Sequence, residues 1–213
     1  MQNPSAILLD LDFTIAHLNG GYETLYEALT EYKIPRYEAK TALRKTADSV
    51  EGFTLESYVA CLAWEGFTAD WSSLLGRFEE IFQKRFALYP DVLQFLESAK
   101  SLEIPLILVT SGHADFQKKK IDIIDFPFDE VCITTTPKGK ADYVYKWQQQ
   151  TGGHVWFVDD KRRELVRVFE TPKVKKAMIT CFEIDRPDRS HKESNKDPRF
   201  VAISSFEKLT LEM

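Results

Sequence analysis

The sequence lacks the features that define several large classes of protein. It contains no run of about 20 apolar residues, the length that crosses a bilayer. Its start, Met1-Gln-Asn-Pro-Ser, has neither the basic region nor the cleavage site of a signal peptide. Its 28 Lys and Arg against 33 Asp and Glu give a net charge of −5, which offers no basic footprint for nucleic acid. These absences predict a cytoplasmic protein that binds neither membranes nor nucleic acid.

Cysteine is also scarce. The three cysteines, Cys61, Cys132 and Cys181, are far apart and lie in apolar surroundings, which argues against a disulfide framework or a zinc site. With 44% hydrophobic and 29% charged residues, the composition is typical of a globular protein rather than a disordered one. The 213 residues suffice for one full domain, or for a core domain with a small insertion.

Short apolar runs alternate with helical patterns in most of the chain. The predicted strands are residues 6–9, 104–109, 130–134, 154–158 and 176–182. Helices are predicted near residues 92–99, 116–124, 140–149, 164–169 and 204–209. This alternation predicts an α/β fold, a Rossmann-like parallel sheet with helices on both faces, formed by residues 1–15 and 89–213. The charged segment 185–197 is predicted to be a solvated loop.

Residues 16–88 show helical periodicity and no strand-like alternation, so they are predicted to form a small helical cap domain. Its hinges are expected near residues 18–21 and 87–90, where the chain leaves and rejoins the core. The cap carries a stripe of aromatic side chains, for which core packing is a simpler interpretation than a ligand site. The stripe includes Tyr58, Trp64, Phe67, Trp71, Phe78 and Phe82.

The first predicted strand ends in two carboxylates, Asp10 and Asp12. Ligands of open α/β sheets bind beyond the carboxyl ends of the strands, so these side chains are expected in a site. Two close carboxylates repel each other unless a cation lies between them, and Mg²⁺ takes oxygen ligands of this kind. The alternative is that Asp-Leu-Asp only caps a turn.

Three further polar clusters follow other strands or open a helix, and parallel strands would bring them to the same sheet edge. They are Thr110, Ser111 and Gly112; Lys138 and Lys140; and Asp159 and Asp160. Together the clusters supply what phosphoryl transfer from a monoester requires. Asp10 is the predicted nucleophile and Asp12 the general acid and base. Thr110, the amides that follow it and a lysine would bind the phosphoryl oxygens, and Asp159 and Asp160 would complete an acidic wall for the metal.

These motifs resemble those of the haloacid dehalogenase-like hydrolase superfamily. The matching stretches are Ile7-Leu-Leu-Asp-Leu-Asp-Phe-Thr14, Leu106-Ile-Leu-Val-Thr110, Pro137-Lys-Gly-Lys140 and Val155-Trp-Phe-Val-Asp-Asp160. The resemblance implies a nucleophile at Asp10, an acid and base at Asp12, and Mg²⁺ held by Asp10, the Asp12 carbonyl and Asp159. A helical insertion directly after the first motif resembles the family's cap. Phe13 and Val158 stand where the family often has glycine.

Some assignments stay open. Lys138 matches the family's lysine motif better than Lys140 and is preferred as the phosphate contact. Thr110 could instead be a helix N-cap, and Asp160 could pair with Lys161, Arg162 or Arg163.

The preferred function is a magnesium-dependent phosphatase acting on a small phosphorylated metabolite, which would be the protein's main partner. The alternatives are a phosphomutase or dehalogenase on the same fold, or a non-catalytic binding protein. In the resemblance, dehalogenases do without the second aspartate, so Asp12 argues against that branch. The sequence gives no indication of the substrate's identity or of the oligomeric state.

Overall fold

The chain forms two compact units in a computed structural model that describes residues 3–47, 49, 52–136, 138–188 and 197–212. The α/β unit comprises Met1–His17, Leu88–Ser111 and Phe126–Met213. The helical unit comprises Leu18–Ala87 and Gly112–Asp125. The predicted cap, residues 16–88, differs from the helical unit mainly in that Gly112–Asp125 joins the latter. The fold class expected from the sequence, a Rossmann-like α/β sheet with helices around it, is confirmed.

The α/β unit is built on a six-stranded sheet in which each strand runs parallel to its neighbours. The strand order is β5-β4-β1-β6-β7-β8. The strands are β1 (Ala6–Leu9), β4 (Leu106–Ser111), β5 (Glu130–Thr134), β6 (Val155–Asp159), β7 (Ile179–Ile184) and β8 (Val201–Ile203). β1 lies in the middle, paired with β4 on one side and β6 on the other. The carboxyl ends of β1 and β6 are therefore adjacent.

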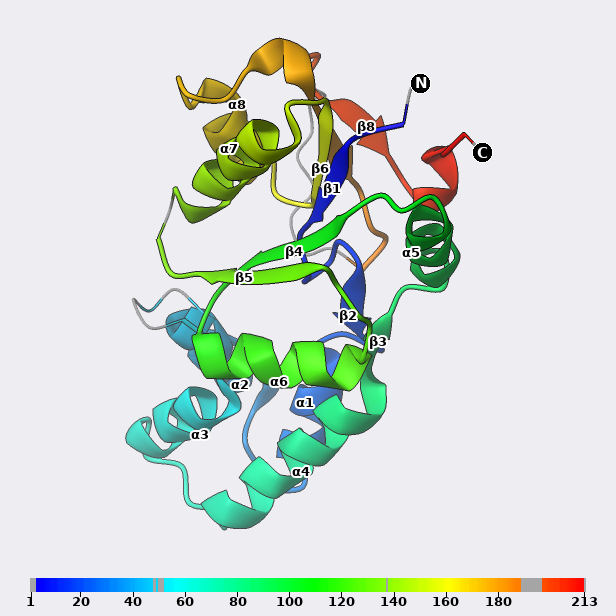
Figure 1. Ribbon diagram of the computed structural model, residues 1–213. Helices are drawn as coiled ribbons and strands as arrows, with labels where there is room; N and C mark the ends of the chain where they lie inside the picture. Colours follow the sequence, from blue (N-terminus) through cyan, green and yellow to red (C-terminus); the bar gives the residue numbers. More distant parts are fainter. Residues whose placement is uncertain (1–2, 48, 50–51, 137, 189–196, 213) are drawn as a thin grey trace. The chain divides into compact units, whose positions relative to one another are not determined.

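Helices cover both faces of this sheet. Helices α7 (Gly139–Thr151) and α8 (Arg162–Glu170) lie on one face and α5 (Val92–Ser101) on the other (Figure 1). Successive strand side chains point to opposite faces, so every second residue of β1, β4 and β6 faces α7 and α8. These residues are Ala6, Leu8, Ile107, Val109, Val155 and Phe157. The alternate positions of these strands are also buried, as expected for a parallel sheet covered on both sides. They are Ile7, Leu9, Leu106, Leu108, Trp156 and Val158.

The helical unit contains α1 (Glu23–Thr30), α2 (Arg36–Ala47), α3 (Leu55–Trp64), α4 (Trp71–Arg85) and α6 (Ala114–Ile124). Tyr58, Phe78 and Phe82 are buried, and the rings of Tyr58 and Phe78 stack with centroids 5.6 Å apart. The core-packing interpretation is wrong for Trp64, which is 90% exposed. The apolar face of α3 passes through Leu55, Tyr58, Val59 and Leu62, and Trp64 comes on the opposite side of the helix.

Several short elements escaped prediction. β2 (Ala16–Leu18) and β3 (Phe86–Leu88) pair in a separate two-stranded sheet at the two points where the chain passes between the units. β8 was not predicted, and the expected closing helix at 204–209 is only a 3₁₀ turn, η2 (Phe206–Lys208). A second 3₁₀ turn, η1 (Lys176–Met178), replaces the start of the expected last strand. Within the described residues, the helices are too short or too polar to cross a membrane.

Candidate active site

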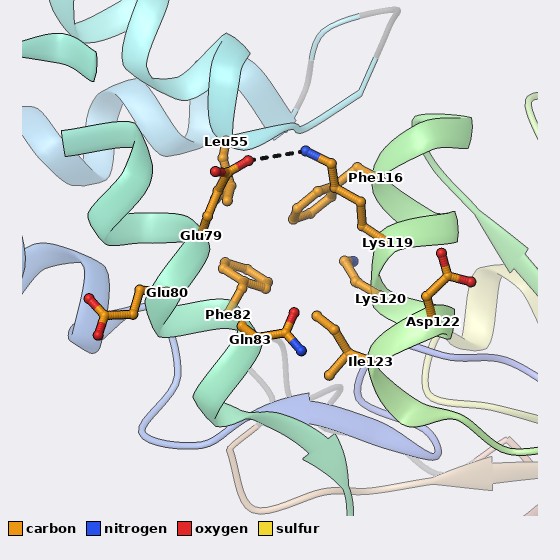
Figure 2. Close-up of a pocket in the computed structure, with 10 residues that line it drawn as sticks. All are labelled: Leu55, Glu79, Glu80, Phe82, Gln83, Phe116, Lys119, Lys120, Asp122 and Ile123. Carbon is orange, nitrogen blue, oxygen red and sulfur yellow. Dashed lines mark hydrogen bonds and ion pairs between the residues drawn. The ribbon is translucent and has the colours of Figure 1, made fainter. Parts of the chain in front are cut away.

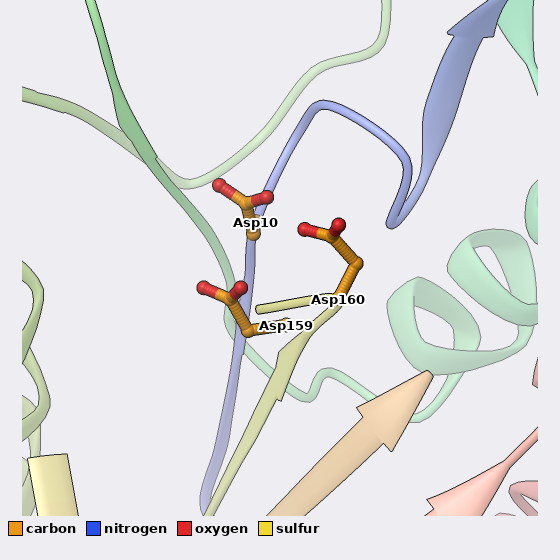
Figure 3. Close-up of side chains that lie close together, drawn as sticks. All are labelled: Asp10, Asp159 and Asp160. Carbon is orange, nitrogen blue, oxygen red and sulfur yellow. The ribbon is translucent and has the colours of Figure 1, made fainter. Parts of the chain in front are cut away.

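Three carboxylates meet where β1 and β6 end. Asp10 directly follows β1, Asp159 is the last residue of β6, and Asp160 comes next (Figure 3). All three are buried, and one oxygen from each lies within 4.8 Å of the others. Asp10 is held by its own backbone, since its N–H donates to the Val158 carbonyl at 3.0 Å and continues the β1–β6 pairing. This cluster of three carboxylates therefore results directly from the parallel register of the two strands.

A buried lysine bridges two of these carboxylates. Lys140, in the first turn of α7, donates from Nζ to Asp10 Oδ1 at 2.6 Å and to Asp159 Oδ2 at 2.7 Å. The other oxygen of Asp159 accepts the backbone N–H of Lys161 at 2.8 Å. Because charge-assisted hydrogen bonds are roughly twice as strong as neutral ones, these contacts fix both carboxylates in place.

Burial and charge act in opposite directions on these groups. Burial and the neighbouring Asp159 raise the pKa of Asp10 to about 6, although Lys140 and Lys161 oppose this rise. Burial alone would lower the pKa of Lys140, but the Asp10 and Asp159 carboxylates outweigh it and hold that pKa above its ordinary value. Lys140 is therefore a permanent cation at neutral pH.

The loop after β1 is tightly wound around one conformationally unusual residue. The N–H groups of Ile15 and Ala16 both donate to the Leu11 carbonyl, at 3.1 and 3.0 Å. Phe13 has φ +58°, a left-handed conformation that costs a non-glycine residue roughly 1–2 kcal/mol. This explains why glycine is suited to that position, where the sequence instead has phenylalanine.

Thr14 connects this loop to both strand ends. Its buried hydroxyl accepts the Asp160 N–H at 3.0 Å and donates to Asp10 Oδ2 at 3.4 Å. Thr14 belongs to the first motif, Ile7 to Thr14, whose pattern alone does not indicate this role. Its spacing of four residues from Asp10 was the available signal.

The other predicted site residues lie in different elements and differ in burial. Asp12 is half-buried and its backbone bridges to Ala16. Thr110 is buried within β4, two residues beyond Leu108, the partner of Leu9 in β1. The helix N-cap alternative for Thr110 is wrong, because the N-cap of α6 is His113. Gly112 belongs to the helical unit, so its phosphate role stays a prediction.

The two candidate lysines lie in different surroundings. Lys138 is exposed at the N-cap position of α7, whereas Lys140 contacts the carboxylates. The geometry thus favours Lys140, contrary to the sequence-based preference for Lys138. Ser111 Oγ lies 3.2 Å from Thr134 Oγ1 of the neighbouring strand β5.

Asp160 lies within the cluster of three carboxylates, as its predicted role as a metal ligand requires. Two of the arginines considered as its ion-pair partners have acidic partners elsewhere. Arg162 makes paired hydrogen bonds with Glu183 at 3.0 Å, and Arg163 lies 3.5 Å from Glu164.

The charged segment 185–197 contains a buried residue, which corrects the expectation of a fully solvated loop; residues 189–196 lie outside the described residues. Arg186 is 3% exposed. Its Nη1 donates to both carboxylate oxygens of Asp91, and its Nε and Nη2 donate to the Thr14 carbonyl. Partners 95 and 172 residues away bury it, so no local pattern could reveal it.

The donor set of this site suits a hard divalent cation. Carboxylate oxygens are the ligands that Mg²⁺ prefers, and Asp10, Asp159 and Asp160 offer three of them close together. Lys140 supplies one positive charge against these three carboxylates, and buried carboxylates need paired charge to stay ionised. The residues present therefore fit a divalent cation.

The helical unit contains a separate pocket of about 560 Å³ between α4 and α6 (Figure 2). Phe82 and Phe116 form its apolar wall, with ring centroids 5.2 Å apart. Lys119 at its rim pairs with Glu56 and Glu79 at 3.1 and 3.3 Å. The charges at this rim are mixed in sign and partly neutralised by one another.

Comparison with known proteins gives the family. The haloacid dehalogenase-like hydrolase family matches residues 7–166, which include Asp10, Lys140, Asp159 and Asp160. The chain belongs to this family. A search of curated proteins found no match.

Solved structures of the haloacid dehalogenase-like (HAD) type share the fold at low sequence identity. A dehalogenase determined as an intermediate complex has 14% identity and a TM-score of 0.67, with 98% of this chain and 96% of that chain covered. A protein from Thermotoga maritima provisionally assigned as a β-phosphoglucomutase has 16% identity and a TM-score of 0.62, with the same coverage. The provisionally assigned HAD hydrolase YfnB from Bacillus subtilis, determined with bound magnesium, has 18% identity and a TM-score of 0.60, with 98% and 97% covered. Because all three are distant, they establish the fold alone.

Proposed function

We propose that the protein is a magnesium-dependent phosphatase that hydrolyses a phosphomonoester of a small metabolite through an aspartyl-phosphate intermediate. The observation that carries the proposal is the buried Lys140 ammonium, which contacts Asp10 and Asp159 beside a third carboxylate, Asp160. This arrangement joins a candidate nucleophile, a fixed cation and further carboxylates that could serve as metal ligands in one place.

The chain's own residues would divide the reaction into two displacements. In the first, an Asp10 carboxylate oxygen forms a bond to phosphorus while the bond from phosphorus to the leaving oxygen breaks, and Asp12 gives that oxygen a proton. In the second, Asp12 takes a proton from water, the water oxygen attacks phosphorus, and the Asp10–phosphorus bond breaks to release inorganic phosphate. Lys140 keeps Asp10 ionised for the first step, since its charge opposes the effect of burial on the Asp10 pKa.

Magnesium would be held by Asp10, the main-chain carbonyl of Asp12, Asp159 and Asp160. When bound, it would neutralise charge on the phosphoryl oxygens. The bound magnesium of the Bacillus subtilis protein YfnB supports this assignment by analogy of fold. Thr110 and Ser111, at the end of β4, would donate hydrogen bonds to the same oxygens.

The structural neighbours include a dehalogenase and a provisionally assigned mutase, so fold alone does not select the reaction. Two features favour phosphoryl transfer. Asp12 supplies the acid and base that ester cleavage and intermediate hydrolysis need. Three buried carboxylates that lie close together, two of them bound to one lysine, also suit a site that takes up a divalent cation.

A direct experiment compares three reactions of the purified protein. Wild type with Mg²⁺ is expected to release phosphate from p-nitrophenyl phosphate and from members of a panel of phosphorylated sugars, nucleotides and organic acids. It should release no halide from 2-chloropropanoate and should not interconvert sugar phosphates. Halide release without phosphatase activity would replace the proposal with a dehalogenase. Phosphate release that persists undiminished in Asp10→Asn would remove the covalent mechanism.

A further inference from the structure

All three nitrogens of the Arg186 guanidinium group donate hydrogen bonds, although this residue follows a strand end in a charged stretch of sequence. Its Nη1 donates to both carboxylate oxygens of Asp91 at 2.9 Å. Its Nε and Nη2 donate to the main-chain carbonyl of Thr14 at 3.1 and 2.9 Å. Each of the three nitrogens thus has a defined partner.

Two aromatic rings lie against this guanidinium group. Its central carbon lies 4.0 Å from the ring centroid of Tyr89 and 5.4 Å from that of Phe206. Asp91 is fixed as well, because its Oδ2 accepts the backbone N–H of Phe206 at 2.6 Å. A planar fork can satisfy the carboxylate, the carbonyl and the rings together, whereas a lysine ammonium is a point charge that cannot. The position therefore requires arginine.

Thr14 links Arg186 to the cluster of three carboxylates. Its carbonyl is held by Arg186, and its hydroxyl is hydrogen-bonded to the Asp160 N–H and to Asp10 Oδ2. One buried residue is thus tied on one side to the arginine and on the other to the residues that follow β1 and β6.

The loop that contains Thr14 needs an external restraint. Phe13, immediately before Thr14, adopts φ +58°, and such conformations persist where the surrounding structure over-determines them. The two hydrogen bonds from Arg186 to the next carbonyl along the chain are charge-assisted, and so among the stronger restraints available.

We infer that Arg186 is a positioning residue for the phosphoryl transfer proposed above. By holding the Thr14 carbonyl, it keeps the Thr14 hydroxyl between Asp10 and the backbone of Asp160, and so sets the placement of the nucleophile. It contacts none of the groups assigned to the reaction directly. The kinetic part of this inference rests on the proposed function, whereas the hold on Thr14 is measurable without activity.

The main variant is the double substitution Asp91→Asn with Arg186→Met. Removing both charges avoids a buried unpaired charge, and an asparagine oxygen can still accept the Phe206 N–H. The control is Asp197→Asn with Arg199→Met, which removes another arginine–aspartate pair that lies over aromatic rings near the carboxyl end of the chain. Arg186→Lys keeps the charge and serves as the conservative variant if the double variant does not fold.

Two readouts are compared for variants whose folding is verified by circular dichroism. With p-nitrophenyl phosphate and Mg²⁺, the double variant is expected to lose kcat by roughly tenfold to a hundredfold, the scale expected for a misplaced reacting group, with KM changed less than about threefold. Arg186→Lys should fall between it and wild type, and the control should match wild type. Hydrogen exchange of the Asp160 amide, which Thr14 protects, should accelerate about tenfold in the double variant relative to amides of β4.

Unchanged kcat in the folded double variant, or in Arg186→Lys if only that variant folds, would overturn the inference. Unchanged Asp160 exchange in the same variant would also overturn it. If wild type shows no phosphatase activity, the proposed function fails by itself. The exchange measurement then decides alone whether Arg186 holds Thr14.

Discussion

Lys140 Nζ lies 2.6 Å from Asp10 Oδ1, and the two residues are 130 positions apart in the sequence. The contact joins the first turn of α7 to the end of the central strand β1. A buried cation at this point keeps a buried carboxylate ionised and also presents positive charge where a phosphoryl group would approach. The contact therefore gives the most direct test of the site.

Replacing Lys140 by methionine should remove most activity. The buried carboxylates lose their counter-charge, and a transition-state contact of this kind is typically worth about 10²–10³ in kcat. Lys138→Met should have a much smaller effect because that side chain is exposed. Lys146→Met on the same helix, which breaks a partly exposed pair with Glu130, is the matched control. Steady-state kinetics with Mg²⁺ would check the ranking, and a larger loss in Lys138→Met would restore the sequence-based preference.

The difference between the two lysines shows what sequence reasoning could reach. The motif Lys-Gly-Lys predicted a lysine at the start of a helix, and the structure has one there. The choice between the two depends on which side chain points toward the strand ends. That direction is set by the packing of α7 on the sheet through Ala141 and Val144, not by the motif.

The main strands were predictable because apolar runs buried on both faces carry a strong signal. Polar residues directly follow β1 and end β4 and β6, so their shared edge followed from parallel topology. The strands β2, β3 and β8 have three residues each and depend on their partners rather than on their own composition. Arg186 was missed for the same reason, since distant residues bury a side chain that is normally solvated.

Removal of divalent metal should abolish phosphate release. We expect full loss of activity in EDTA and recovery on addition of Mg²⁺, because three buried carboxylates and one lysine leave unbalanced negative charge at the site. Calcium should inhibit, since it takes more ligands in looser geometry than Mg²⁺. Phosphate release assays across a series of metal concentrations would measure this. Full activity in chelator would exclude the magnesium assignment.

Stability should depend on pH through Asp129. Burial alone would raise the pKa of this carboxyl, but hydrogen bonds from the Leu106 N–H and from Lys100 outweigh burial and lower it. A lowered folded-state pKa stabilises the protein above the unfolded pKa of ~3.9, and this stabilisation is lost as pH falls through the folded value.

Asp129→Asn should therefore lower the free energy of unfolding at pH 7 by roughly 0.5–1 kcal/mol, a small value because the pair with Lys100 is partly exposed. Urea denaturation at pH 7 and at successively lower pH would show the difference from wild type shrinking below about pH 4. A difference that stays constant with pH would mean that charge at this position does not contribute.

The two aspartates of the first motif should fail in different ways. Asp10→Asn nearly preserves shape but removes the attacking carboxylate and a metal ligand, so turnover should fall by several orders of magnitude. Asp12→Asn keeps the main-chain carbonyl and removes proton transfer, a contribution of typically ~10²–10⁴-fold. Its first step should survive better on an aryl phosphate than on an alkyl phosphate, because a good leaving group needs little protonation. Hydrolysis of the intermediate would still lack a base.

The aspartyl phosphate should consequently accumulate in Asp12→Asn. Rapid quenching followed by mass spectrometry of the peptide containing Asp10 would detect the added phosphoryl group, and Asp10→Asn is the matched negative control. On aryl substrates, the adduct should form in Asp12→Asn at a rate similar to that in wild type. It should disappear far more slowly than in wild type. If neither wild type nor Asp12→Asn shows an adduct while Asp10→Asn still turns over, Asp10 is a structural residue and the attacking group lies elsewhere.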